Sequence, residues 1–189
     1  MPTETPTQLS AGAGTGAATS TVGGAAGGVL DIIASAESGG NYNAWYGNAG
    51  QNAVDLSTLT LDRIRDLQKD LVKTRGGSPI GRYQILDDTL DRLAVRMGLS
   101  GSEPFTPELQ DRMGLLLMRD AGFNAWQRGS IDDATFNYRL SKVWAGLPMD
   151  ASNQSYYEGK AGNRATVDYA VVMDGLRRLK GPGTVERGS

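Results

Sequence analysis

The chain has 189 residues, with 19 basic and 21 acidic side chains and neither cysteine nor histidine. Without these two residue types, the usual structural zinc sites, thiol catalysis and Ser-His-Asp catalysis are excluded. A net charge of -2 gives no electrostatic reason to expect a nucleic-acid partner. No apolar run approaches membrane-spanning length and no signal peptide pattern is present, so we expect synthesis in a reducing cytoplasm without membrane insertion.

The N-terminal segment, residues 1–28, consists mainly of Gly, Ala, Thr and Ser. Such a segment cannot bury enough apolar surface to offset the entropy that it loses on ordering. We therefore expect a flexible arm over residues 1–28, one folded domain over 29–182 and a short C-terminal tail over 183–189.

The predicted elements after the arm are mostly helical. Apolar periodicity predicts a first helix from Val29 that ends at Gly39-Gly40. Residues 44–47 and 52–56 each have the composition of a short strand, which predicts a small β-region. Further helices are expected over 61–75 after a Thr60 cap, from an Asp87 or Asp88 cap to Gly98, from Pro107 after a Thr106 cap, and over 123–127, 132–144 and 164–180. This order predicts an α+β, helix-dominated domain.

Glu37 falls in the last turn of the first predicted helix, four residues after the apolar Ile33. The helix dipole and burial both disfavour a charged carboxylate there, so both raise its pKa. A glutamate that keeps its proton near neutral pH can protonate a poor leaving group, although most single glutamates are exposed and have no such role. The residues that follow supply amide and aromatic groups of the kind that bind sugars: Ser38, Asn41, Asn43, Trp45 and Tyr46.

Three separated pieces of the chain share this chemical character. They are ESGGNYNAWYG at 37–47, GRYQIL at 81–86, and WAGLP at 144–148 followed by SYYEGK at 155–160. Together they resemble the lysozyme-like superfamily and, within it, the lambda-type phage endolysins, which are peptidoglycan lytic transglycosylases. The resemblance covers about residues 30–180 and implies a lysozyme-like fold with a small β-region and a helical lobe.

The resemblance also implies roles for individual residues. It makes Glu37 the single catalytic acid/base and places Gln84, with Tyr83 beside it, in the cleft near the scissile bond. Either Tyr156 or Tyr157 would be the late cleft tyrosine. The full set of implied substrate contacts is Ser38, Tyr46, Asp55, Arg82, Tyr83, Gln84, Tyr156 and Tyr157.

The roles of two further motif residues are not set by the resemblance alone. Arg82 is either a surface or capping arginine or a residue with a role near Glu37. Trp144 lies at helical spacing from Phe136 and Leu140, which favours a place in the core over a sugar platform.

The number of carboxylates bears on the mechanism, because glycosidic hydrolysis usually needs a second one. One hydrolytic group of phage lysozymes carries an aspartate nine residues after its glutamate; here that position is Tyr46, and Asp55 remains a candidate. With Glu37 alone, the resemblance implies transglycosylation between N-acetylmuramic acid and N-acetylglucosamine, which closes a 1,6-anhydro ring. It implies no metal and no cofactor.

The expected function is therefore murein cleavage by a lytic transglycosylase in the periplasm or cell wall. The alternatives are a hydrolytic lysozyme that uses Asp55, and a virion or cell-wall-binding module that no longer cuts. The expected partner is the peptidoglycan glycan strand. An arm on such a domain is also consistent with attachment to a phage tail or cell-entering assembly.

Overall fold

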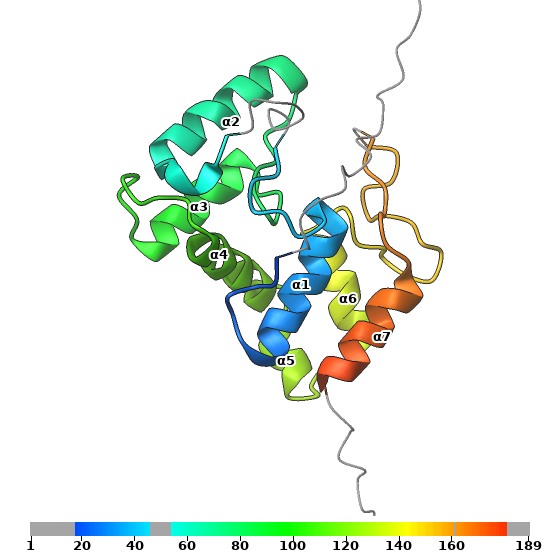
Figure 1. The fold of residues 1–189 in the computed structure, drawn as a ribbon. Helices are drawn as coiled ribbons and strands as arrows, with labels where there is room; N and C mark the ends of the chain where they lie inside the picture. Colours follow the sequence, from blue (N-terminus) through cyan, green and yellow to red (C-terminus); the bar gives the residue numbers. More distant parts are fainter. Residues whose placement is uncertain (1–17, 46–53, 161, 181–189) are drawn as a thin grey trace, which may run out of the picture.

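The computed structural model describes residues 18–45, 54–160 and 162–180. The described chain is dominated by helices (Figure 1), as the sequence predicted. The elements are α1 (Gly24–Ser38), the short 3-10 helix η2 (Leu56–Thr58), α2 (Leu61–Arg75), α3 (Asp87–Met97), α4 (Pro107–Asp120), α5 (Phe123–Gln127), α6 (Asp133–Ser141) and α7 (Tyr169–Lys180).

Extended pairing is limited to three isolated antiparallel bridges in the described residues: Thr60 with Pro104, Ile80 with Ile85, and Pro148 with Ser155. Of the two segments expected to form strands, residues 44–45 and 54–56 are described and none of them is in a strand, whereas residues 46–47 and 52–53 lie outside the described residues. Where the chain resumes, Asp55 is the N-cap of η2.

Helix α1 is the central element of the fold. It packs against α7 and α4, and Figure 1 shows α2 and α3 on one side of it and α6 and α7 on the other. Val29, Leu30 and Ile33 are completely buried along its length, and each such side chain contributes about 1.5–3 kcal/mol to folding. This packing fixes the C-terminal end of α1 between the two groups of helices.

The N-terminal boundary lies earlier than residue 28. Helix α1 begins at Gly24, and its turn at Gly27 is buried. The backbone N–H of Thr21 donates to the carboxylate of Asp111, 2.6 Å away. The expected boundary therefore falls inside α1, because polar contacts anchor a segment that has few apolar side chains. Residues 1–17 and the predicted tail at 183–189 lie outside the described residues.

Helix caps decide the remaining boundaries. Thr60 and Thr106 accept hydrogen bonds from the backbone of Arg63 and Leu109, which confirms both predicted caps. The predicted cap of α3 is wrong: Leu86 occupies the N-cap position. The carboxylate of Asp87 instead accepts the hydroxyl of Ser78 at 2.7 Å.

Two helices are shorter than expected. Helix α6 ends at Ser141 instead of at 144, and α7 begins at Tyr169 instead of at 164. Trp144 nevertheless lies in the core at 3% exposure, as its spacing predicted.

Limited proteolysis tests the revised boundary. Because residues 18–28 are hydrogen-bonded or helical, we expect the protease-resistant core to begin at or before about residue 20. Mass spectrometry of the resistant fragment gives its first residue. A stable core that begins near residue 29 would contradict the boundary seen in the structure.

Candidate active site

Glu37 lies in the last turn of α1, whose C-cap is Gly39 in the left-handed conformation (φ 63°). Its carboxyl group is half-buried and accepts a hydrogen bond from the backbone N–H of Gly146 at 2.8 Å. Burial raises the pKa of Glu37 to about 7, while this hydrogen bond lowers it by a smaller amount. The direction agrees with the one predicted from the sequence.

The loop between α6 and α7 contacts the end of α1 through hydrogen bonds. Thr166 donates its hydroxyl to the carbonyl of Ala36 at 2.5 Å and its N–H to the carbonyl of Gly146 at 2.9 Å. A Cβ at Gly146 would lie 2.5 Å from the Ala36 oxygen and 2.9 Å from the Glu37 carboxylate. Only glycine therefore brings its N–H this close to Glu37.

Sequence reasoning missed Gly146 and Thr166 as parts of this site. The WAGLP motif did contain a signal, because Gly146 sits within it. The sequence does not show, however, that this glycine meets a glutamate 109 residues earlier.

A tight turn at Gly81–Gln84 lies beside the end of α1. It is closed by the bridge between Ile80 and Ile85. Ser38, the neighbour of Glu37, donates its hydroxyl to the carbonyl of Arg82 at 2.8 Å. Trp144 donates its indole N–H to the carbonyl of Tyr83 at 3.2 Å. The turn is therefore hydrogen-bonded both to the end of α1 and to the segment that contains Gly146.

Gln84 occupies a strained position in this turn. Its φ of 47° lies in the left-handed region, which costs a non-glycine residue on the order of 1–3 kcal/mol. Its side-chain amide donates to the carbonyls of Gly81 (2.8 Å) and Ala44 (3.3 Å) and stays partly exposed. Of the GRYQ residues, Gln84 is the one whose side chain is open to a ligand.

Arg82 and Tyr83 are both only 1% exposed, which contradicts the expectation that they contact substrate. The Tyr83 hydroxyl donates to Asp111 at 2.6 Å, and burial together with this carboxylate raises the pKa of Tyr83. Arg82 forms an ion pair with Asp31 at 2.6 Å and donates to the carbonyl of Gly40 at 2.6 Å. Arg82 is therefore an internal residue, and its surface interpretation is wrong.

Asp55 caps η2 with its own side chain. One carboxylate oxygen accepts the N–H of Ser57 at 3.0 Å and its hydroxyl at 2.7 Å. The residue is exposed, and capping accounts for its position. Tyr46, the other candidate from this region, lies outside the described residues.

Tyr156 and Tyr157 lie in the loop between α6 and α7. Their rings meet edge to face, with centroids 5.1 Å apart. Tyr156 is 41% exposed, whereas Tyr157 is more buried and donates its hydroxyl to the carbonyl of Lys142 at 2.7 Å. The loop is tied to the segment that contains Gly146, because Ser155 donates its hydroxyl to the carbonyl of Ala145 at 2.7 Å. Of the two tyrosines, Tyr156 offers the more accessible ring.

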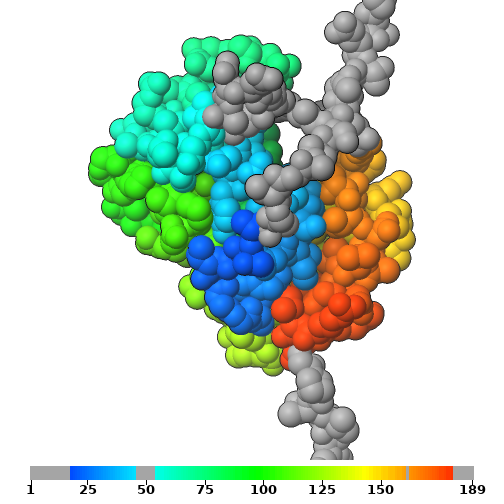
Figure 2. All heavy atoms as spheres, viewed as in Figure 1, coloured from blue at the N-terminus to red at the C-terminus, as the bar shows by residue number. Residues whose placement is uncertain are grey.

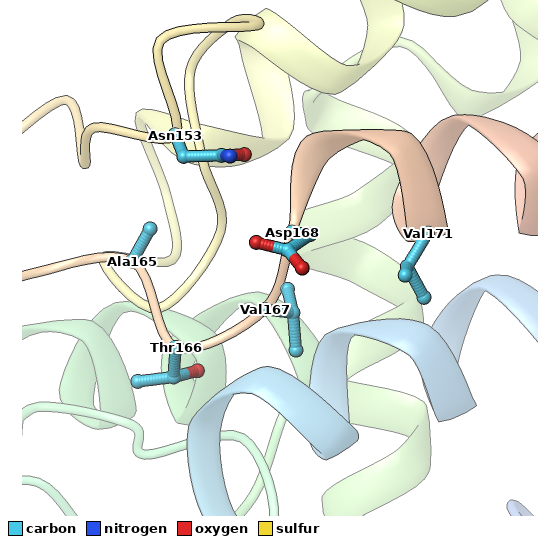
Figure 3. Close-up of a pocket in the computed structure, with 6 residues that line it drawn as sticks. All are labelled: Asn153, Ala165, Thr166, Val167, Asp168 and Val171. Carbon is cyan, nitrogen blue, oxygen red and sulfur yellow. The ribbon is translucent and has the colours of Figure 1, made fainter.

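A pocket of about 370 Å³ opens beside Thr166. Figure 3 shows that the side chains of Asn153 and Asp168 face the same space from the loop and from the start of α7. Its lining residues are Asn153, Ala165, Thr166, Val167, Asp168 and Val171.

The described residues contain no group of three or more acidic side chains placed to hold a metal ion. None of their helices is long and apolar enough to cross a membrane.

Comparison with known proteins places this geometry in a family. The endolysin family model matches residues 27–165. Among solved structures, bacteriophage lambda lysozyme complexed with a chitohexasaccharide is similar, with a TM-score of 0.50 and 20% sequence identity over 84% of this chain and 95% of that chain. No curated protein sequence matches. The chain therefore has a lysozyme-like fold and belongs to the endolysin family of phage enzymes that degrade peptidoglycan.

Proposed function

We propose that this endolysin is a lytic transglycosylase that cleaves the β-1,4 bond between N-acetylmuramic acid and N-acetylglucosamine. The observation that carries the proposal is the half-buried carboxyl of Glu37, whose pKa of about 7 lets one group serve as acid and then as base. No second carboxylate hydrogen-bonds to Glu37 or shares its Gly146 donor in the part of the chain that the structure describes.

In the proposed first step, protonated Glu37 gives its proton to the glycosidic oxygen as the bond to C1 breaks. The N-acetyl carbonyl of the substrate stabilises the positive centre at C1. The N–H of Gly146, 2.8 Å from the carboxyl oxygen, favours the carboxylate that remains. In the second step, this carboxylate takes the proton of the C6 hydroxyl, whose oxygen closes the 1,6-anhydro ring. Glu37 is then protonated again and needs no metal or cofactor.

Substrate positioning is assigned to the exposed groups around Glu37. We infer that Gln84 binds the glycan near the scissile bond, and that Tyr156 offers its ring to a more distant sugar. Ser38 acts indirectly, because its hydroxyl is used by the carbonyls of Ala34 and Arg82. The chitohexasaccharide in the lambda lysozyme structure supports an extended glycan as ligand.

The alternative is a hydrolytic lysozyme in which Asp55 activates water. The Asp55 oxygen that is engaged by Ser57 already has a structural role at the start of η2, which favours the mechanism with a single carboxylate. A non-catalytic cell-wall-binding module is disfavoured by the raised pKa of Glu37, because a purely structural role does not need that shift.

The proposed site of action is the periplasm or cell wall. Attachment to a phage tail through the N-terminal residues remains a proposal that rests on the composition of residues 1–17. Co-purification of the protein with intact virions, detected by mass spectrometry, distinguishes a virion component from a free enzyme.

Product analysis separates transglycosylation from hydrolysis. A digest of murein is treated with borohydride and the muropeptides are weighed by mass spectrometry. We expect anhydro-muramic ends, which borohydride leaves unchanged in mass, because the C6 hydroxyl and not water is the acceptor. A digest dominated by reducible ends, each gaining two hydrogens, would instead establish hydrolysis and make Asp55→Asn the next variant to test.

Replacement of Glu37 by glutamine separates its chemical role from its effect on stability. Glu37→Gln should lose about 10²–10⁴-fold or more in activity, because glutamine has no proton to transfer. Since the pKa is raised from 4.5 to about 7 by folding, this group favours the folded state below pH 4.5, and the contribution disappears as pH rises through 7. At pH 8 the free energy of unfolding of Glu37→Gln should therefore exceed that of the parent by on the order of 2–3 kcal/mol. At pH 4 the two proteins should be nearly equal in stability. Denaturant unfolding at both pH values measures the difference.

The matched control is Glu108→Gln, which changes an exposed glutamate in the first turn of α4. It should change activity little and show no comparable gain in stability at pH 8. A Glu37→Gln protein that digests murein at near the parent rate would rule out Glu37 as the acid.

A further inference from the structure

The carboxylate of Asp111 is completely buried in α4, yet the proposed reaction does not use it. Two tyrosines donate to it: Tyr83 at 2.6 Å and Tyr42 at 2.9 Å. Three further donors come from the N-terminal segment: the N–H of Thr21 at 2.6 Å and the hydroxyls of Thr21 and Ser20 at 2.8 and 3.0 Å. A buried carboxylate needs such donors, because an unsatisfied charge in the interior is strongly destabilising.

The N-terminal segment also contacts Arg82. The guanidinium of Arg82 donates to the carbonyl of Ala18 as well as to that of Gly40. It pairs with Asp31, whose carboxylate also accepts the N–H of Ser20 at 2.6 Å. We call residues 18–22 the N-terminal clasp. Figure 2 shows the start of the described chain (dark blue) lying across the face where α4 (green) meets α1 (lighter blue).

Through Arg82 and Tyr83, the clasp reaches the turn at 81–84. The side chains of both residues bind carboxylates that also accept hydrogen bonds from the clasp, Asp31 for Arg82 and Asp111 for Tyr83. The backbone carbonyls of both residues bind side chains close to Glu37 or to its donor Gly146. The carbonyl of Arg82 accepts the hydroxyl of Ser38, and the carbonyl of Tyr83 accepts the indole of Trp144. The strained backbone of Gln84 follows directly and is retained only if its neighbours hold it in place.

We propose that the N-terminal clasp positions the turn at 81–84 against Glu37, and that Ser20 and Thr21 are positioning residues for the reaction. The proposal rests on the proposed function, since it assumes that Gln84 and Glu37 act on one substrate. The clasp also precedes the residues 27–165 that match the endolysin family. The clasp is therefore an element of this chain that lies outside the matched region. On this proposal, the activity depends on residues 18–22, just upstream of that region.

The test uses the full chain with hydroxyl deletions at the clasp. The double variant Ser20→Ala/Thr21→Val removes two donors to Asp111 and keeps the backbone N–H of Thr21. We expect kcat to fall roughly 10-fold, and up to about 10²-fold, with little change in KM, because small displacements of a positioned group slow the chemical step. Hydrogen exchange measured on the peptide that contains residues 81–85 should become faster.

Rescue and control variants separate positioning from general loss of stability. Thr21→Ser keeps a hydroxyl and should retain the parent kcat and exchange rate. Thr74→Val removes the exposed hydroxyl that donates to the carbonyl of Asp70 in α2, and should change neither quantity. If the double variant does not fold, Ser20→Ala alone, which removes the longest of the three clasp bonds to Asp111, must show the same two effects in weaker form.

Two results would overturn the proposal. One is a parent-like kcat in the folded clasp variants. The other is a lower unfolding midpoint with unchanged exchange at 81–85, which would mean that the clasp only stabilises the fold. Failure of the proposed function has a different signature: an active Glu37→Gln protein, whatever the exchange at the turn. The clasp proposal can therefore fail while the proposed function is upheld, and the two failures are distinguishable.

Discussion

The half-buried carboxyl of Glu37 and its single backbone donor, the N–H of Gly146, form the contact on which the site depends. Burial raises the pKa of Glu37 above its ordinary value of 4.5, and the hydrogen bond from Gly146 lowers it by a smaller amount. Opposing effects of burial and hydrogen bonding leave a pKa near 7. Both protonation states are then accessible, which is what a group acting first as acid and then as base requires.

This contact depends on elements that are far apart in the chain. The core packing of α1 fixes where Glu37 lies, and the backbone at Ala145–Leu147 approaches only because residue 146 has no side chain. Thr166 holds the same two segments together through Ala36 and Gly146. The polar network around Asp111 and Asp31 binds the side chains of Tyr83 and Arg82, and the Arg82 carbonyl accepts the hydroxyl of Ser38 beside Glu37.

Local signals in the sequence predicted much of the fold. Apolar periodicity located α1, α2 and α4, and the threonines at 60 and 106 cap the helices that follow them. The pKa direction of Glu37 also followed from its place at a helix end beside the core. The cap of α3 was missed because the side chain of Asp87 binds Ser78, a competing partner that helix propensity does not reveal.

The parts that escaped prediction depend on contacts between distant residues. The donor to Glu37 is 109 residues away, and Thr21 binds a carboxylate 90 residues further on. Composition made residues 18–28 resemble an unanchored arm, because it counts apolar side chains and not hydrogen bonds to a buried aspartate. The motif predicted that Arg82 and Tyr83 line the cleft. In the structure both side chains are buried, Arg82 in an ion pair with Asp31 and Tyr83 in a hydrogen bond to Asp111.

The most direct test of this account is a measurement of the pKa of Glu37 in the folded protein. The side-chain carboxyl carbon is followed by ¹³C NMR as pH is varied, and its signal is assigned by its absence in Glu37→Gln. The account predicts a midpoint near 7. A midpoint near 4.5, the ordinary value for glutamate, would show that the site does not retain the proton and would contradict Glu37 as a general acid near neutral pH.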